Sequence, residues 1–121
     1  MQLQQVLVNL LVNARDAMPT GGTIRVETRN IDVEAADTQK HAVEEGRYVL
    51  LSVTDSGCGI SPEVRDKIFE PFFTTKESGG TGLGLSSARR IVADHGGRLD
   101  VGSNEDGKGA VFHVWLPIHR P

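Results

Sequence analysis

Apolar positions at helical spacing open the chain. In the segment QLQQVLVNLLVNARDAM they recur every three or four residues, as one face of an α-helix requires, at Leu3, Leu7, Leu10 and Ala14. No glycine or proline interrupts this pattern before Pro19, and Thr20-Gly21-Gly22 then stop it. The pattern therefore predicts a helix over residues 2–18.

Two segments further along carry the patterns of β-strands. Residues 23–31 (TIRVETRNI) alternate, with Ile24, Val26 and Thr28 on one side, and predict a strand with one wet face. Residues 48–54 (YVLLSVT) form a denser apolar run, which is typical of a more central strand. The segment between them, residues 32–47, is polar and mostly acidic, and we expect it to be a surface connection.

The second half of the chain predicts two helices and a hairpin. Ser61 as cap and Pro62 in the first turn indicate a short helix that runs to about Phe69. Residues 74–82 should be flexible, and residues 83–95 form a helix with an inner stripe of Leu85, Ala88, Ile91 and Val92. Residues 99–103 and 110–116 read as a final hairpin. This order predicts a sheet covered on one face by helices, an α/β sandwich.

Composition bounds the choice of function. A chain of 121 residues fits a single domain, residues 1–121, and its 38% apolar content allows one modest core. The net charge of -3 gives no electrostatic reason to expect nucleic acid or an acidic membrane as a partner. Cys58 is the only cysteine, which excludes an internal disulfide and favours a cytoplasmic setting. Met1 opens directly onto the helical pattern, so we expect a fragment of a longer protein.

The first helix carries a narrow polar stripe. Asn9, Asn13 and Asp16 are spaced by four and three residues, which places them within an arc of roughly 60°. One interpretation is a hydrated edge whose amides cap nearby loops. The other is an edge that faces Mg²⁺ and phosphate, because hard cations take oxygen ligands such as an Asn carbonyl.

The predicted central strand ends in Asp55-Ser56-Gly57-Cys58-Gly59-Ile60. A carboxylate at the end of a buried strand is unfavourable unless a group donates a hydrogen bond to it. Two alternate glycines, Gly57 and Gly59, would let the backbone approach a ligand such as a purine, whose amino group is a donor. The plainer interpretation is a turn with an Asx hydrogen bond.

A glycine-rich run opens the second long helix. Residues 79–85 read GGTGLGL, and free backbone N–H groups at a helix start suit phosphates. The run matches neither a P-loop nor a dinucleotide-binding fingerprint. A flexible linker would explain its glycines but not Leu83 and Leu85. Lys76, just before it, is either an ordinary surface lysine or a group that reaches a β- or γ-phosphate.

Three phenylalanines surround Pro71, namely Phe69, Phe72 and Phe73. Core packing accounts for most of their presence. They would also anchor one end of a moving lid.

Five motifs follow one another along the chain: QVLVNLLVNARDAM, DSGCGI, IFEPFFTTK, GGTGLGLSSARRIV and GKGAVFHVWLP. In this order they resemble the N box, first glycine box, phenylalanine box, second glycine box and final glycine-phenylalanine motif of sensor histidine kinase catalytic domains. The form NARDAM resembles hybrid and nitrogen-regulator-like kinases. The resemblance implies the Bergerat ATP-binding fold shared with gyrase and MutL. That fold is a two-layer sandwich with a mixed, mostly antiparallel sheet covered on one face by about three helices.

The resemblance also assigns roles to residues. Asn13 matches the asparagine that binds the Mg²⁺ bridging the phosphates, and Asn9 matches the first asparagine of the same box. Asp55 matches the carboxylate that hydrogen-bonds the adenine amino group. The expected catalytic residues are Asn9, Asn13 and Lys76. The remaining expected contacts to ATP are Asp16, Gly57, Gly59, Ile60, Thr81, Gly82, Leu83, Gly84 and Leu85.

Asn9 separates this chain from the gyrase-like relatives, which carry a water-activating Glu at that position. A carboxylate accepts the proton of water, whereas a carboxamide does not. Asn9 therefore disfavours ATP hydrolysis as the main reaction. Two positions depart from the common pattern: Asp16 stands where many members have Lys or Arg, and Ala110 where Thr or Ser often follows the final glycine.

The resemblance implies transfer of the ATP γ-phosphate to a histidine of a separate dimerisation domain in the same parent protein, and onward to a response regulator receiver domain. None of His41, His95, His113 and His119 has the surroundings of an acceptor, so the isolated domain should be unable to phosphorylate itself. The resemblance places the acceptor in a separate dimeric domain, and the isolated domain should be monomeric. The alternatives are an ATP-hydrolysing clamp, a degenerate module that binds a nucleotide or a partner, and a serine kinase on the same fold. The parent protein would be cytoplasmic or anchored in a membrane.

Overall fold

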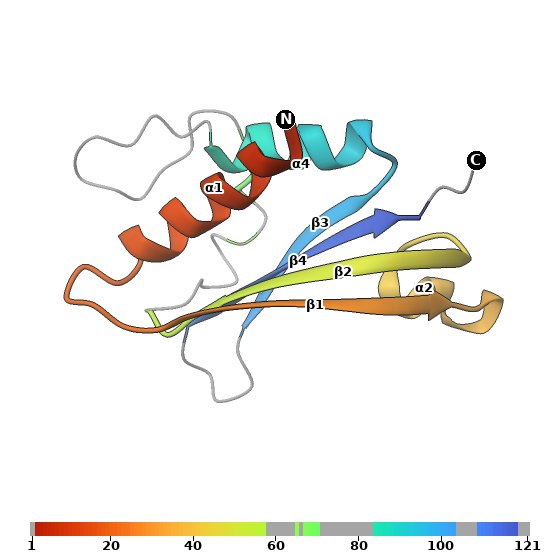
Figure 1. Cartoon of the computed structure of the whole chain (residues 1–121), viewed down its shortest axis with the longest axis horizontal. Helices are drawn as coiled ribbons and strands as arrows, with labels where there is room; N and C mark the ends of the chain where they lie inside the picture. The colour runs from red at the N-terminus through yellow and green to blue at the C-terminus, as the bar shows by residue number, and fades with distance from the viewer. Residues whose placement is uncertain (1, 58–64, 66, 71–83, 104–108, 119–121) are drawn as a thin grey trace.

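The computed structural model describes residues 2–57, 65, 67–70, 84–103 and 109–118 (Figure 1). Its four strands are β1 (Ile24–Val33), β2 (Gly46–Asp55), β3 (Arg98–Ser103) and β4 (Ala110–Pro117). They form one sheet in the order β1-β2-β4-β3. Every neighbouring pair is antiparallel within the described residues, and the predicted hairpin of β3 and β4 is confirmed.

Two long helices cover one face of this sheet. They are α1 (Gln2–Asp16) and α4 (Gly84–Asp94), which lie side by side above the strands in Figure 1. Both predicted helices are therefore confirmed, although α1 ends two residues before the predicted boundary. The α/β sandwich predicted from the sequence is the observed fold class. Within the described residues no helix has the length and apolar composition needed to cross a lipid bilayer.

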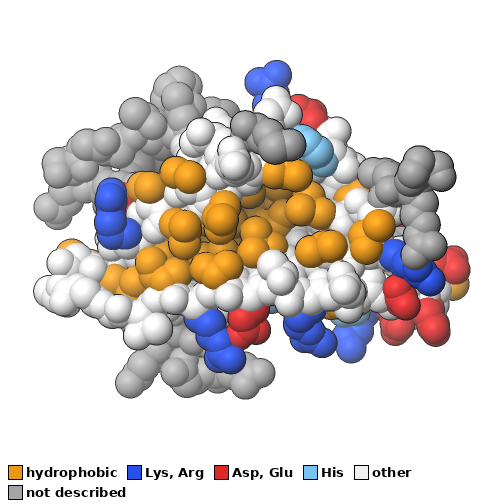
Figure 2. Space-filling model, viewed as in Figure 1, with side chains coloured by type: hydrophobic (Ala, Val, Ile, Leu, Met, Phe, Trp, Pro, Cys, Tyr) orange, Lys and Arg blue, Asp and Glu red, His pale blue; other side chains and the backbone are white. Residues whose placement is uncertain are grey.

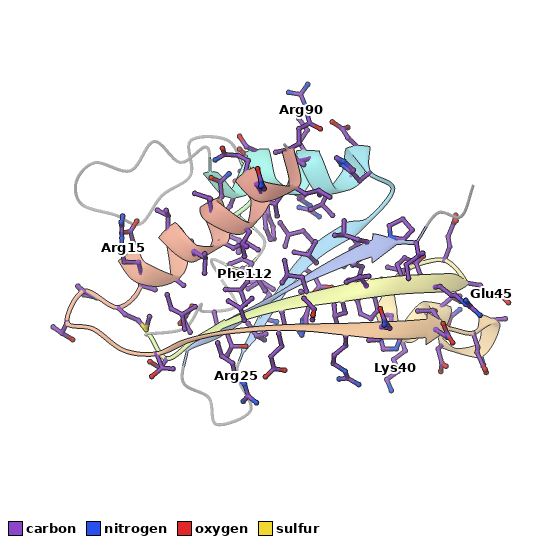
Figure 3. All side chains as sticks on the ribbon, viewed as in Figure 1. Arg15, Arg25, Lys40, Glu45, Arg90 and Phe112 are labelled. Atoms are coloured by element: carbon purple, nitrogen blue, oxygen red, sulfur yellow. The ribbon has the colours of Figure 1, made fainter. Side chains whose placement is uncertain are left out.

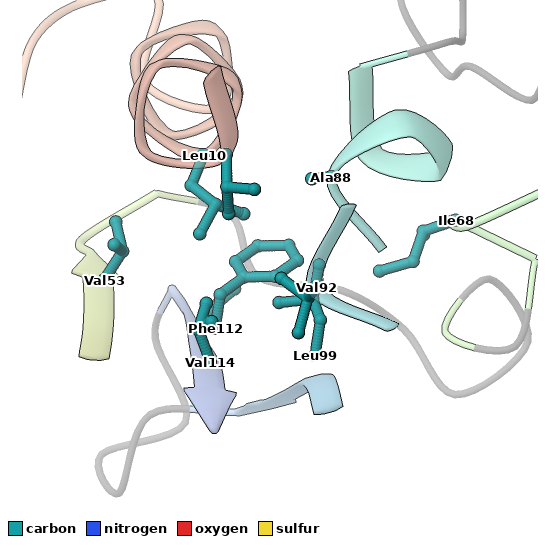
Figure 4. Packing of buried hydrophobic residues seen from close by; sticks show 10 residues of the cluster. Leu10, Val53, Ile68, Ala88, Val92, Leu99, Phe112 and Val114 are labelled. Atoms are coloured by element: carbon teal, nitrogen blue, oxygen red, sulfur yellow. The ribbon is translucent and has the colours of Figure 1, made fainter. Parts of the chain in front are cut away.

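The main core lies between the two helices and the sheet. Figure 4 shows the Phe112 ring at its centre, with Leu10 from α1 and Val92 from α4 close by. Phe112 and Leu10 are 1% and 0% exposed. The buried members of the cluster are Val6, Leu10, Val53, Ile68, Ala88, Val92, Leu99, Ala110, Phe112 and Val114. Burial of this apolar surface is the main force that holds the helices on the sheet.

Phe69 packs against this core, as the plainer interpretation of the phenylalanines predicts. Its ring meets Phe112 edge to face at 6.3 Å, and the Arg89 guanidinium lies 4.8 Å from its centre. Phe72 and Phe73 lie outside the described residues, as does most of the predicted helix over residues 61–69. The predicted flexible stretch, residues 74–82, also lies outside them.

A second, smaller cluster lies on the opposite face of the sheet. Val33, Tyr48, Leu50 and Trp115 are buried there. They alternate with the residues of the main core, because successive side chains of a strand point to opposite faces. The short helices η1 (Ala35–Asp37) and α2 (Thr38–His41) lie beneath the sheet at this end (Figure 1).

The segment 32–47 is more ordered than a surface connection. Strand β1 continues to Val33, which is 2% exposed, and β2 already begins at Gly46. Val43 packs against the second cluster. The predicted bounds were wrong at both ends, because the buried Val33 and the partly buried Val43 are isolated in a polar run and leave no periodic signal; residues 34–45 are the mostly exposed connection.

The edge of the sandwich between α1 and β1 exposes apolar side chains. Figure 2 shows hydrophobic atoms gathered along this edge. Val26 of β1 is 46% exposed and Leu3 of α1 is 37% exposed. Val26 lies on the side of β1 that was predicted to be apolar, and it is exposed because β1 is an edge strand of the sheet.

Tyr48 provides a test of the second cluster at alkaline pH. Its hydroxyl donates a hydrogen bond of 2.7 Å to the Glu44 carbonyl. Burial, and then the negative charge of Glu44, raise the pKa of Tyr48 above its ordinary value of 10.0. Since the folded-state pKa is the higher one, this stabilisation is present below the unfolded pKa and is lost as pH rises through the folded pKa.

Tyr48 is the only tyrosine, so the ultraviolet absorbance of its phenolate can be titrated directly. We expect a midpoint above 10 in the folded chain and a return to the ordinary value in denaturant. In Tyr48→Phe, the fall of unfolding free energy above that pH should be shallower than in the parent. A midpoint at or below 10 in the folded chain would contradict this description of the cluster.

Candidate functional site

Asp55 is the buried charged residue of the structure. It stands at the end of β2 and is 3% exposed, and no other charged side chain among the described residues is buried. Its Oδ1 atom accepts hydrogen bonds from the Gly57 N–H at 2.9 Å and the Ala110 N–H at 3.3 Å. The predicted need for donors to this carboxylate is therefore confirmed. The Gly57 bond is also the Asx-type turn of the plainer interpretation.

The surroundings of Asp55 are closely packed. Gly109 has a φ of +78°, which favours glycine, and a Cβ there would overlap the carbonyl oxygen of Asp55. A Cβ on Gly57 would lie 2.5 Å from the carbonyl oxygen of Ala17, just beyond α1. Gly57 is thus required by the packing of the chain on itself. The end of β2, the start of β4 and the end of α1 meet at this point.

Asn9 joins the first helix to the start of α4. Its Nδ2 atom donates to the Gly84 carbonyl at 2.9 Å, across 75 positions of sequence. Its Oδ1 atom accepts a hydrogen bond of 2.7 Å from the Gln5 side chain. The Asn9 carboxamide therefore has a partner on both of its polar atoms. The structure brings the predicted N box and the predicted phosphate-side glycine together through this residue.

Asn13 and Asp16 follow Asn9 on the same side of α1. Asn13 is half-buried, and its carboxamide makes no hydrogen bond to another residue in the described part of the chain. Asp16 is the last residue of α1, and its Oδ1 atom lies 3.3 Å from Arg15 Nη2. This pairing gives the carboxylate a neighbouring positive charge. The predicted polar stripe is thus present, with Asn13 the least engaged of its members.

Helix α1 therefore links the candidate residues that the structure describes. Its middle reaches the start of α4 through Asn9, and its end reaches the turn after Asp55. Leu85 packs against the main core, in line with its place in the predicted inner stripe. A Cβ on Gly84 would meet nothing closer than Asn9, at 3.9 Å. Gly59, Ile60, Lys76, Thr81, Gly82 and Leu83 lie outside the described residues.

Sequence reasoning missed three contributors to this arrangement. The Ala110 N–H and the left-handed Gly109 hold Asp55 from the opposite strand. Ser56 ties the site to the loop after α1, since its Oγ accepts from the Thr23 N–H at 3.0 Å and donates to Met18 Sδ at 3.3 Å. The signal available for Gly109 was its place directly before a predicted strand. The register that brings it beside Asp55 has no local signature.

The residues fit a purine nucleotide in one specific respect. Both hydrogen bonds that described residues make to the Asp55 carboxylate use Oδ1. A carboxylate has about four lone-pair sites, so Oδ2 retains capacity to accept a hydrogen bond from a ligand. Because the carboxylate is fixed by backbone donors, its second oxygen is pre-oriented for an amino group.

Comparison with known proteins gives a consistent result. The family described as histidine kinase-, DNA gyrase B- and HSP90-like ATPase matches residues 1–120. The sensor kinase CckA of Brucella abortus is 52% identical over 118 residues, which cover 96% of this chain and 12% of CckA. The sensor histidine kinase ZraS of Salmonella typhimurium is 44% identical over 97% of the chain and 22% of its own length. The chain thus spans less than a quarter of these relatives.

A solved structure supports the same fold. The catalytic domain of histidine kinase ThkA superposes with a TM-score of 0.75 at 35% identity, covering 96% of this chain and 66% of that domain.

Proposed function

The chain belongs to the family of histidine kinase-, DNA gyrase B- and HSP90-like ATPases, its relatives include sensor histidine kinases, and on that premise we propose that it binds Mg²⁺ and ATP and donates the γ-phosphate to a histidine of a separate dimerisation domain. The parent protein would then pass the phosphate to the receiver domain of a response regulator. Full-length ShkA, 32% identical with a TM-score of 0.76, was solved in complex with AMPPNP. That complex supports the nucleotide part of the proposal.

The observation that carries the proposal is the buried carboxylate of Asp55. Oδ1 is held by the Gly57 and Ala110 amides, and Oδ2 would accept the exocyclic amino group of adenine. A guanine offers a carbonyl oxygen at the corresponding position, and an acceptor facing a carboxylate is unfavourable. Asp55 would therefore select adenine over guanine.

The polar side of α1 would face the phosphates. The Asn13 carboxamide, which has no hydrogen-bond partner among the described residues, would supply an oxygen to a divalent cation. Bound Mg²⁺ offsets the negative charge that the phosphates carry. Gly84 at the start of α4 would let the backbone come close to the phosphates, because glycine carries no side chain and the nearest atom to the place of a Cβ is Asn9 Cγ, at 3.9 Å.

Asn9 supports transfer to a protein over hydrolysis. A water-activating base needs a free lone pair at the position that faces the γ-phosphate. Asn9 has no acidic group, and its amide is engaged with Gln5 and the Gly84 carbonyl. Its role would be to position α4 against α1, so that the phosphate stays intact until a histidine attacks.

Asn13→Ala should remove most of the Mg²⁺ dependence of nucleotide binding. If Mg²⁺ strengthens binding of an ATP analogue about tenfold in the parent, we expect less than about twofold in the variant, since one metal ligand is lost. Calorimetric titration with and without Mg²⁺ measures the ratio. Asn30→Ala, an exposed asparagine of β1, is the matched control. An unchanged ratio in Asn13→Ala would reject the metal role of Asn13.

Transfer itself is tested by mixing the chain with acceptor domains from the related sensor kinases and ATP labelled at the γ-phosphate. We expect label that is stable in alkali and lost in acid, as phosphohistidine is, on the acceptor domain only. A second acceptor with its histidine replaced by Gln should stay unlabelled. Release of free phosphate without labelling of any acceptor would identify a hydrolase instead.

A further inference from the structure

The face of the sheet turned away from α1 and α4 carries a groove of about 620 Å³. Strand register places Arg29 opposite Leu50, and Leu50 opposite Trp115, all on this face. Val53 lies in the main core, so Asp55, two residues further along β2, is on the face of the sheet that packs against the helices and not on the face with the groove. The groove therefore shares no residue with the candidate nucleotide site.

One wall of the groove is basic. Arg29 of β1 and Lys40 of α2 line it, and neither has an ion-pair partner among the described residues. Figure 2 shows Lys and Arg side chains beneath the sheet with Asp and Glu side chains among them, and Figure 3 shows Lys40 on that side, opposite Arg90 above the helices. Two unpaired cations on one wall favour an anionic occupant.

Asp100 is the acid among the described residues that line the groove, and it is already paired. Asp100 of β3 lies 3.4 Å from Arg98 Nε and 3.3 Å from His113 Nδ1. The negative charge of Asp100 is therefore offset by the Arg98 guanidinium. The net electrostatic character of the groove is positive.

The floor of the groove is aromatic and apolar. Trp115 lines it and is 5% exposed, and the His41 ring lies 4.9 Å from the Trp115 ring. The indole Nε1 of Trp115 is buried, with no hydrogen-bond partner among the described residues. The indole ring therefore packs into the sheet, and only its edge borders the groove.

From this arrangement we propose that the groove is a second binding site, for a small aromatic anion such as a ring that carries a carboxylate or phosphate. The ring lies against the apolar lining beside Leu50 and Trp115, and the anionic group pairs with Arg29 and Lys40. A volume of about 620 Å³ is of the size that small-molecule sites have. This size favours a small molecule over an acidic protein segment.

Trp115 is the only tryptophan, so its indole N–H signal in a nitrogen-correlated NMR spectrum reports on the floor of the groove. The probe is 2-naphthoate, with the neutral 2-naphthamide and the ringless acetate as comparators. We expect 2-naphthoate to shift the indole signal saturably, and the other two to bind at least about tenfold more weakly, since each lacks one half of the recognition. Equal binding of the amide would overturn the proposal.

Two double variants test whether the positive charges of the groove hold the ligand. Arg29→Gln with Lys40→Gln should weaken 2-naphthoate about five- to tenfold, because two partly screened ion pairs are lost. Arg90→Gln with Lys67→Gln removes the same charge from exposed positions outside the groove, and should leave the titration unchanged. Equal weakening in both pairs, no saturable shift, or a shift caused only by an acidic peptide would each overturn the proposal.

Discussion

Replacement of Asp55 by Asn should abolish useful nucleotide binding while leaving the fold intact. The Asn side chain can still accept at one oxygen from the Gly57 and Ala110 amides, which preserves the turn after β2. Its NH₂ group would then take the place of Oδ2, so that this donor would face the amino group of adenine, which is also a donor. Loss of a charged hydrogen bond, together with this mismatch, predicts binding of an ATP analogue about 100-fold weaker.

Calorimetry on the folded variant measures this effect, with circular dichroism to confirm the fold. Asp32→Asn is the matched control, since Asp32 is exposed near the far end of β1 and its carboxylate pairs with Arg47 at 3.7 Å. The control should bind like the parent. An affinity within about threefold of the parent in Asp55→Asn would remove the adenine role of Asp55.

Gly109→Ala should be among the most destabilising single changes in the chain. The residue has a φ of +78°, and an added Cβ would overlap the Asp55 carbonyl oxygen. Relief of that overlap requires the start of β4 to move away from the end of β2. We expect a loss of at least about 2 kcal/mol of unfolding free energy, and weaker nucleotide binding because the Ala110 N–H moves with it.

Gly102→Ala in β3 is the control for this prediction. Its added Cβ would meet only Val111 Cγ1, at 3.8 Å, an ordinary contact distance. Urea unfolding should place this variant within about 1 kcal/mol of the parent. Similar losses in the two variants would show that the close approach of Gly109 to Asp55 is not what limits the substitution.

The fold was predictable where one period dominates a segment. The three- and four-residue spacing of Leu3, Leu7, Leu10 and Ala14 predicted α1, of which Leu10 and Ala14 are buried. The segment 32–47 was not predictable, because Val33 and Val43 are isolated apolar residues whose burial depends on Trp115, far along the chain. Tertiary contacts decide such positions, and no local pattern records them.

The candidate site shows the same division. Asp55 and the need for donors to its carboxylate followed from a charge at the end of an apolar run. The donor from Ala110 depends on the register of β2 against β4, which lie far apart in the sequence and carry no local signature of how they pair. The link between Asn9 and Gly84 spans 75 positions and depends on how α1 packs against α4. Chemistry of single residues was therefore readable from the sequence, and their mutual contacts were not.

The central claim, that this chain is an ATP-binding domain, is tested most directly by calorimetric titration with a non-hydrolysable ATP analogue, with and without Mg²⁺. We predict one site per chain, micromolar affinity, a clear gain on addition of Mg²⁺, and much weaker binding of the guanine counterpart. Absence of any binding heat under both conditions, in a chain shown to be folded, would contradict the assignment of α1 and the end of β2 as a nucleotide site.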